Sequence, residues 1–138
     1  MERRDFLKIA GAALACFGLG RTRRVEAATV PLFNCMVAGF QYYEGPRCIH
    51  TLRPGDPLLL VREPHNPYDE LAVAVHTRDN VKLGFIPRHI NEVPAMHLNN
   101  GKDLHGLVHR INPEEPPWEM LEISVVMSTR DFGRRTGR

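Results

Sequence analysis

The sequence predicts a mostly β protein, a small six-stranded barrel with one short helix, preceded by a separate leader. Three observations lead to this fold class. The chain has 138 residues, of which 43% are apolar and 25% charged, enough for one domain. From Thr29 onward, short apolar runs alternate with Pro, Gly, Asn and Asp, and only one segment departs from that pattern. Length and composition exclude a helicase, a polymerase, a coiled coil and wholesale disorder.

Six apolar segments account for the expected strands. Each is bounded by residues that favour turns. Asp79 and Asn80 form the turn of a hairpin between the third and fourth strands, whereas residues 53–57 and 112–117 hold too many prolines for a central strand. The expected strands are residues 33–41, 58–62, 71–77, 82–86, 102–111 and 120–129.

The exception is residues 91–99, which predict a short helix. Asn91 stands at the N-cap position, and Pro94 falls in the first turn, where its missing N–H has no partner within the helix. Gly101 follows the expected end. The expected apolar contacts of this helix are Val93, Met96 and Leu98.

The leader, residues 1–27, has the pattern of an export signal. Residues 3–8 (RRDFLK) resemble the twin-arginine translocation signal through Arg3, Arg4, Phe6, Leu7 and Lys8. The apolar run at residues 9–20 has 12 residues, whereas a helix needs about 20 to cross a bilayer. We therefore expect no stable membrane span, transport by the twin-arginine translocase, cleavage near Ala27 and a periplasmic or extracellular protein. The alternatives are an N-terminal membrane helix and lipidation at Cys16.

The charges divide unevenly between the leader and the rest of the chain. The leader carries six basic and three acidic residues, and the remaining 111 residues carry 12 basic and 13 acidic ones. A near-neutral body argues against a broad electrostatic binder of nucleic acid, because such proteins depend on neutralising many phosphates. Residues 28–129 form the expected domain, and residues 130–138, with four arginines, form an expected basic tail.

Two cysteines, Cys35 and Cys48, lie in the expected domain. Export places them in an oxidising compartment, where they form either a disulfide or two separate, buried, apolar side chains. The sequence leaves both interpretations open.

Three motifs are rich in groups that contact ligands. Residues 62–69 (REPHNPYD) form a loop stiffened by two prolines, residues 39–45 (GFQYYEG) follow the first strand, and residues 83–88 (LGFIPR) lead to the helix. These motifs, with Ala72 and Val73, resemble the HIRAN domain, found in certain DNA-repair helicases and as a stand-alone bacterial protein. The resemblance covers residues 33–128. It implies an OB-like or SH3-like barrel, which in the helicase members holds the 3′-hydroxyl end of single-stranded DNA.

The resemblance also implies a set of contact residues. Two positions depart from the end-binding members: Gln41 stands where they have an arginine, and Phe85 replaces a polar residue. Trp118 is a further candidate as an aromatic wall. The implied DNA-end contacts are Tyr42, Asn66, Tyr68, Asp69 and Arg88.

The chemistry of these residues suits that role. Tyr42 and Tyr68 offer rings for base stacking, Arg88 a cation for a phosphate, and Asn66 a hydrogen-bonding amide. Asp69 would repel internal phosphates and accept a hydrogen bond from a free terminal hydroxyl, so a 3′-phosphate should be rejected. Structural roles are the alternative: Tyr42 or Tyr43 in the core, Asp69 capping its own loop, and Arg88 solvated.

Catalytic and metal-binding patterns are missing from the sequence. Cys48 with His50, and His105 with His109, do not have the spacing of a zinc site, and no serine precedes Ser124. We expect a binding protein without enzymatic activity, cofactor or metal. The alternative function is an exported module that binds a peptide, a glycan or a protein in the same cleft.

Overall fold

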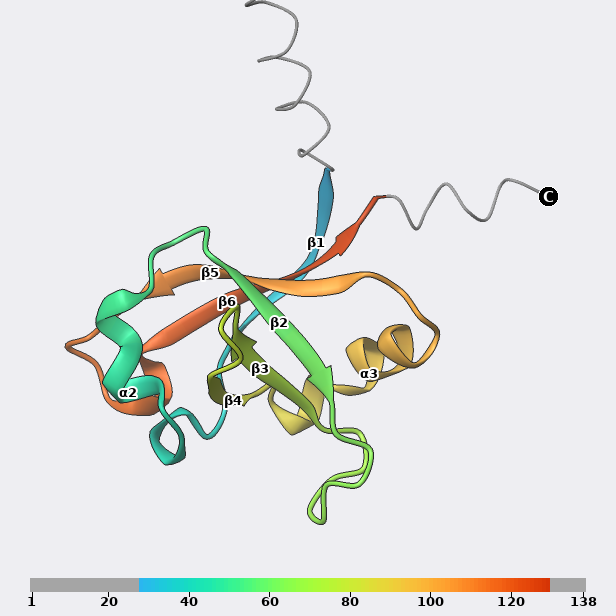
Figure 1. Cartoon of the computed structure of the whole chain (residues 1–138), viewed down its shortest axis with the longest axis horizontal. Coiled ribbons are helices and arrows are strands. Elements are labelled where there is room, and N and C mark those ends of the chain that lie inside the picture. Colours follow the sequence, from blue (N-terminus) through green and yellow to red (C-terminus); the bar gives the residue numbers. More distant parts are fainter. Residues whose placement is uncertain (1–27, 130–138) are drawn as a thin grey trace, which may run out of the picture.

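The computed structural model of the protein describes residues 28–129, and the expected export signal and basic tail lie outside the described residues. This region contains six strands and two helices (Figure 1). Four short 3-10 turns connect them, at Phe40–Tyr42, Ile49–Thr51, Arg88–Ile90 and Pro117–Glu119. The strands and helices are β1 (Thr29–Met36), α2 (Gly45–Cys48), β2 (Pro57–Arg62), β3 (Val73–Thr77), β4 (Lys82–Phe85), α3 (Glu92–Asn99), β5 (Leu104–Ile111) and β6 (Leu121–Ser128).

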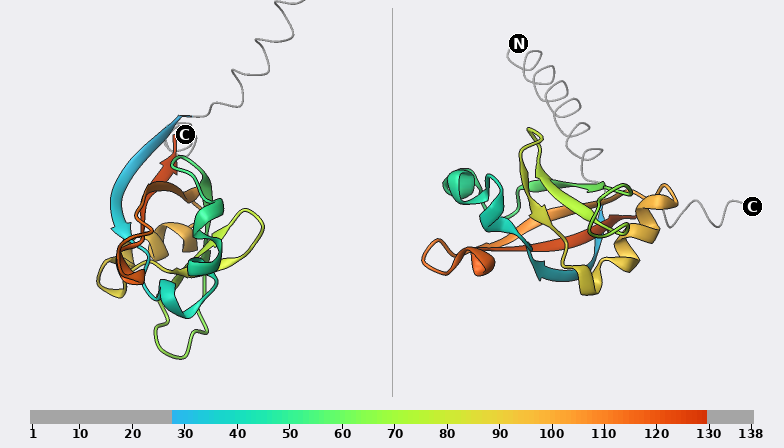
Figure 2. Two further views of the ribbon diagram at one scale, coloured as in Figure 1. Left: turned by 90° about the vertical axis from the view of Figure 1, so that its left-hand side faces the viewer. Right: turned by 90° about the horizontal axis from the view of Figure 1, so that it is seen from below.

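The six strands form one antiparallel sheet whose two edges meet. The strand order is β1-β6-β5-β2-β3-β4. Ala38, just beyond β1, exchanges two backbone hydrogen bonds with Phe85 at the end of β4, at 2.8 and 2.9 Å. This bridge joins the edge strands, and the views in Figure 2 show the sheet curling around its interior. The prediction of a mostly β, six-stranded fold with a short helix is confirmed.

The interior of the curled sheet is the apolar core. Every strand contributes at least one buried apolar side chain, and Phe40, from the turn after β1, is fully buried. Alternation along the strands explains this, because side chains at every second position face the same side of a sheet. The largest of these fully buried side chains include Leu58, Val73, Leu83, Val125 and Ile123.

The connection between β1 and β2 differs most from the sequence-based expectation. The expected strand 33–41 was wrong at both ends, because β1 starts at Thr29 and stops at Met36. Gly39 has a φ of 73°, which turns the chain into the 3-10 turn at Phe40–Tyr42. Helix α2 was not expected. The Phe40 ring packs directly on the backbone of Gly45, where a side chain would overlap the ring.

Helix α3 lies where the sequence placed it, but it buries a different face. Pro94 and Ala95 are its buried residues, whereas Val93 and Met96, expected to be apolar contacts, are exposed. The expected side-chain cap is also missing, because the side chain of Asn91 makes no hydrogen bond to the helix. None of the helices within residues 28–129 is long and apolar enough to cross a membrane.

Candidate nucleic-acid interface

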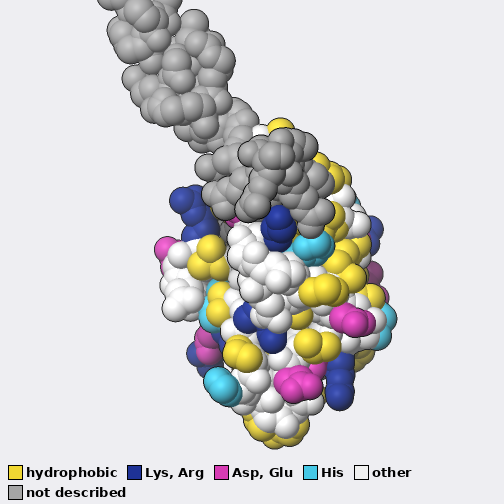
Figure 3. All heavy atoms as spheres, turned by 90° about the vertical axis from the view of Figure 1, so that its right-hand side faces the viewer, with side chains coloured by type: hydrophobic (Ala, Val, Ile, Leu, Met, Phe, Trp, Pro, Cys, Tyr) yellow, Lys and Arg dark blue, Asp and Glu magenta, His cyan; other side chains and the backbone are white. Residues whose placement is uncertain are grey.

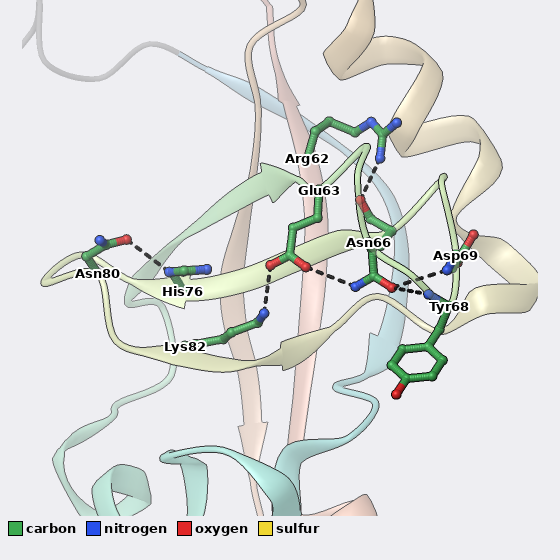
Figure 4. A network of polar contacts seen from close by, with 9 residues as sticks. Arg62, Glu63, Asn66, Tyr68, Asp69, His76, Asn80 and Lys82 are labelled. Carbon is green, nitrogen blue, oxygen red and sulfur yellow. Dashed lines mark hydrogen bonds and ion pairs between the residues drawn. The ribbon is translucent and has the colours of Figure 1, made fainter.

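The loop that joins β2 to β3 is organised by the side chain of Asn66. Its Oδ1 accepts hydrogen bonds from the backbone N–H groups of Tyr68, at 2.8 Å, and Asp69, at 3.2 Å. Its Nδ2 donates to Oε1 of Glu63, at 3.0 Å (Figure 4). Such side-chain bonds to the following backbone are typical of asparagine in tight turns. The amide that the sequence suggested as a ligand contact therefore shapes the loop.

Arg62, the last residue of β2, fixes the far side of this loop. Its guanidinium donates to the backbone carbonyls of Ala72, at 2.6 Å, and Glu70, at 2.8 Å. Its Nε donates to Oδ1 of Asn99 at the end of α3, at 3.0 Å. The loop is thus held to β3 and to α3, which limits the entropy it can lose on binding a ligand.

Asp69 is held from two sides. Its Oδ1 accepts from the backbone N–H of Leu71, at 2.9 Å, and its Oδ2 accepts from Nδ2 of Asn91, at 2.7 Å. The backbone bond from Leu71 is the main reason that the pKa of Asp69 lies below its usual value, and Asn91, Arg88 and Arg62 lower it further. Asp69 is consequently an ionised, oriented acceptor.

Lys82, at the start of β4, connects the loop to an aromatic pair. Its Nζ lies 2.6 Å from Oε2 of Glu63, 4.9 Å from the ring centroid of Tyr43 and 4.4 Å from that of Phe85. The Tyr43 and Phe85 rings meet edge to face, with centroids 5.8 Å apart. Burial raises the pKa of Glu63, but the hydrogen bonds from Lys82 and Asn66 more than offset that effect and leave it below its usual value.

One open cleft of about 410 Å³ lies between the loop and the junction of β1 with β4, and the groups just described that line it are Tyr43, Asn66, Asp69, Lys82 and Phe85. A second hollow of about 440 Å³ lies against the same loop and shares Tyr68, Asp69 and Arg88 with the first. Tyr68 presents a ring that is 84% exposed. Of the residues expected from the sequence, the cleft brings together Asn66, Tyr68, Asp69, Phe85 and Arg88.

Three expected contact residues lie outside this cleft. Tyr42, 79% exposed, and Gln41 belong to the 3-10 turn after β1, and Trp118 lies on the neighbouring turn before β6. The Oε1 atom of Gln41 is buried without a hydrogen-bond partner. The expectation that Tyr42 lines the same groove as Tyr68 was wrong, because Tyr43 points into the cleft instead.

Sequence reasoning missed Tyr43 and Lys82 as cleft residues. Strict alternation along β4 would place Lys82 and Phe85 on opposite faces of the sheet. A register shift in the pairing of β3 with β4 interrupts this alternation. Val75 pairs with Gly84, but the next residue, His76, pairs with Lys82, so that position 83 is skipped. The sequence carries no signal for that bulge beyond Gly84 itself.

Other candidate groups stay apart from the cleft residues. Cys35 and Cys48 are free thiols, and burial, with the nearby Glu122, raises the pKa of Cys35 to about 12. Among residues 28–129, no cluster of three or more His, Cys, Asp or Glu side chains is placed to hold a metal ion.

Comparison with known proteins decides the family. The sequence profile of the HIRAN domain matches residues 30–129. The chain belongs to the HIRAN domain family. A protein from Lactobacillus plantarum of known crystal structure shares 33% identity with this HIRAN protein and has a TM-score of 0.65, covering 72% of this chain and 95% of its own.

The HIRAN domain of human HLTF has the same fold. Its crystal structure shares 20% identity and has a TM-score of 0.54, covering 80% of this chain and 93% of its own. An NMR structure shows the HLTF domain in its DNA-bound conformation, with 21% identity and a TM-score of 0.46, covering 75% of this chain and 79% of its own. Among curated proteins the comparison finds no match.

Proposed function

We propose that this HIRAN domain binds single-stranded nucleic acid in the cleft and recognises an unblocked 3′-hydroxyl end through Asp69. The observation that carries the proposal is the joint presence of an exposed ring, an oriented carboxylate and a cation, Tyr68, Asp69 and Arg88, in one cleft. Family membership supports it, because the HLTF member has been solved in a DNA-bound conformation. Each of the three groups matches one part of a strand end.

The internal hydrogen bonds of Asp69 leave room for a ligand. An ionised carboxylate has about four lone-pair sites, and Leu71 and Asn91 occupy one on each oxygen. A terminal sugar hydroxyl can donate to a remaining site, whereas a terminal phosphate is mostly dianionic at neutral pH and repels the carboxylate. Capping the loop and receiving the strand end are therefore compatible roles of the same side chain.

The other cleft residues serve stacking and phosphate contact. Tyr68 can stack on a base from the open side, an interaction worth about 1–3 kcal/mol per base. Arg88 can pair with a phosphate. Asn66 acts by fixing the backbone that presents Tyr68 and Asp69. Tyr42 and Trp118 lie outside the cleft on neighbouring turns, and we propose that they contact only a longer strand that continues past the turn after β1.

The charge distribution favours a local interaction. On the face shown in Figure 3, basic and acidic side chains are interspersed, without a continuous basic stripe. Few phosphates can be neutralised at once, so affinity should depend weakly on salt compared with that of basic nucleic-acid binders. We propose that the protein acts by binding rather than by catalysis.

Fluorescence anisotropy of the full chain with labelled oligothymidylates tests this function. Strands ending in a 3′-hydroxyl should bind at least tenfold more tightly than the same strands ending in a 3′-phosphate, and Asp69→Asn should remove most of the difference. Equal affinity for both ends would refute end recognition. Binding of neither strand would refute nucleic acid as the ligand.

We further propose that the protein is exported by the twin-arginine translocase, on the basis of residues 3–8 and the short apolar run after them. Residues 1–30 fused to a folded reporter should deliver it to the periplasm, and replacing Arg3 and Arg4 together by lysine should abolish delivery. Delivery of the double variant at the original level would reject this route.

A further inference from the structure

Lys82 is a second cation in the cleft, beside the Arg88 that we propose pairs with a phosphate. It is one of the two lysines within residues 28–129, and the other, Lys102, does not line the cleft. Its Nζ lies above the rings of Tyr43 and Phe85, which also line the cleft. The ammonium group therefore lies in the aromatic part of the cleft. Lys82 and Arg88 are the two cations that line the cleft.

The ammonium group of Lys82 is already paired with a carboxylate. Oε2 of Glu63 lies 2.6 Å from Nζ, and both side chains are partly exposed. Figure 4 shows the connected groups: Lys82 contacts one oxygen of Glu63, and Asn66 contacts the other. Oε2 of Glu63 therefore occupies a hydrogen-bonding position at Nζ of Lys82 that a phosphate oxygen of the ligand would take.

We propose that Lys82 binds a phosphate of the ligand and that Glu63 is an internal competitor for the same ammonium group. The inference rests on the proposed function and adds its phosphate-binding residue and the group that restrains it. Binding replaces the carboxylate at Lys82 by a phosphate oxygen. An ammonium has three N–H donors, so the one that bonds to Glu63 can turn to the phosphate while the lysine stays above the two rings.

The exchange has a low cost for the protein. Partly exposed ion pairs contribute little to stability, because solvent screens them and the side chains lose entropy. Glu63 also keeps a partner when Lys82 turns to the ligand, since Nδ2 of Asn66 still donates to Oε1. The loop that presents Tyr68 and Asp69 is consequently retained during the exchange.

Binding of a 3′-hydroxyl oligothymidylate to five full-length variants tests the proposal. Lys82→Gln should weaken binding about three- to tenfold, and the salt slope should fall in magnitude by about 0.7, the value for one phosphate contact on a single strand. Lys82→Arg, which keeps the positive charge, should have an affinity and a salt slope close to those of the wild type. Glu63→Gln, which keeps an acceptor for Asn66, should tighten binding, and this gain should vanish in the double variant Lys82→Gln, Glu63→Gln. Lys102→Gln is the matched control and should change neither value.

Two results would overturn the proposal. One is a Lys82→Gln protein with the affinity and salt slope of Lys102→Gln. The other is a gain from Glu63→Gln that persists without Lys82, because the carboxylate would then act on the ligand directly. Thermal unfolding of each variant separates loss of binding from loss of fold.

A second probe separates this inference from the proposed function. Inorganic phosphate, titrated against chloride at constant ionic strength, should shift the NMR signals of the Tyr43 and Phe85 rings saturably in the wild type and not in Lys82→Gln. If oligothymidylate does not bind but phosphate gives this result, the proposed function fails and the phosphate site stands. No shift in the wild type overturns the site.

Discussion

Nδ2 of Asn91 donates a 2.7 Å hydrogen bond to Oδ2 of Asp69, across 22 residues of sequence. Asn91 is 2% exposed and immediately precedes helix α3. A buried amide at this position would usually cap the helix, and here it fastens the β2–β3 loop instead. The Asp69 carboxylate, which we propose binds the ligand, therefore depends for its orientation on Asn91, a residue that does not line the 410 Å³ cleft.

Replacing Asn91 should loosen this connection. Asn91→Ala removes one of the two donors to Asp69, and we expect the free energy of unfolding to fall by about 1–3 kcal/mol. Urea unfolding followed by circular dichroism measures the change. Asn34→Ala is the control, because Asn34 is exposed and accepts one hydrogen bond from Ser124; it should cost less than about 0.5 kcal/mol. Equal effects of the two substitutions would show that the Asn91–Asp69 bond does not fasten the loop.

The lowered pKa of Asp69 predicts a pH dependence of stability. The folded pKa lies below the usual value of 3.8, so the stabilising effect is fully present above that value and is lost as the pH falls through the folded pKa. The wild type should exceed Asp69→Asn in unfolding free energy at pH 7, and the gap should narrow below about pH 4. Urea midpoints between pH 7 and pH 3 report it. A gap that is independent of pH would contradict the cause given for the shift.

The number and type of the strands could be predicted from the sequence because each strand carries its own apolar alternation and ends at turn residues. Residues 58–62 and 82–86 differ from β2 and β4 by one residue each. The expected start of β1 is four residues too late. Thr29 and Pro31 are exposed on an edge strand, so the beginning of β1 lacks the apolar pattern by which the other strands were recognised. Proline is tolerated at such an edge.

The candidate site was predicted less completely, for a physical reason. The loop of residues 63–69 could be recognised because its contacts are local, as for Asn66 and the following N–H groups. Lys82 and Tyr43 enter the cleft through a bulge and a 3-10 turn, which depend on contacts between distant segments. The role of Asn91 was missed for the same reason, since the local signal favoured a helix cap.

The exposed ring of Tyr68 gives a prediction that separates binding from stability. Tyr68→Ala removes a side chain that is 84% exposed, so the unfolding free energy should change by less than about 0.5 kcal/mol. Loss of one stacked base should weaken strand binding by about 1–3 kcal/mol. Trp118→Ala, 56% exposed and outside the cleft, is the control with short strands of three nucleotides. A larger loss of binding for Trp118→Ala would move the site to the turn before β6.

The two thiols of the barrel should differ in reactivity. Cys35 is buried and has a pKa of about 12, whereas Cys48 is half-buried with a pKa that burial raises. Thiolates are the reactive form, so iodoacetamide at pH 8 should modify Cys48 at least about tenfold faster than Cys35. Mass spectrometry of tryptic peptides measures both rates. A peptide pair linked by Cys35 and Cys48 in protein purified from the periplasm would establish the disulfide instead.

Gly84 is the residue on which closure of the barrel depends most directly. Its φ is 150°, a conformation that residues with a side chain rarely adopt, and it packs against the segment that bridges the sheet edges. A Cβ at this position would overlap the carbonyl oxygen of Ala38 and lie 2.7 Å from Cγ1 of Val37. Both neighbours are fixed, because Ala38 makes the two bridging hydrogen bonds and Val37 is buried.

Gly84→Ala should therefore combine backbone strain with overpacking and lower the unfolding free energy by at least about 2 kcal/mol. Gly101→Ala is the control, since its φ is also positive, at 76°, but no atom lies within 4 Å of the added carbon; it should cost about 1 kcal/mol. Opening of the bridge would also displace Phe85, so ligand affinity should fall in Gly84→Ala and stay unchanged in Gly101→Ala. Equal losses of stability would mean that the edges of the sheet can separate without strain, and that the cleft does not depend on their closure.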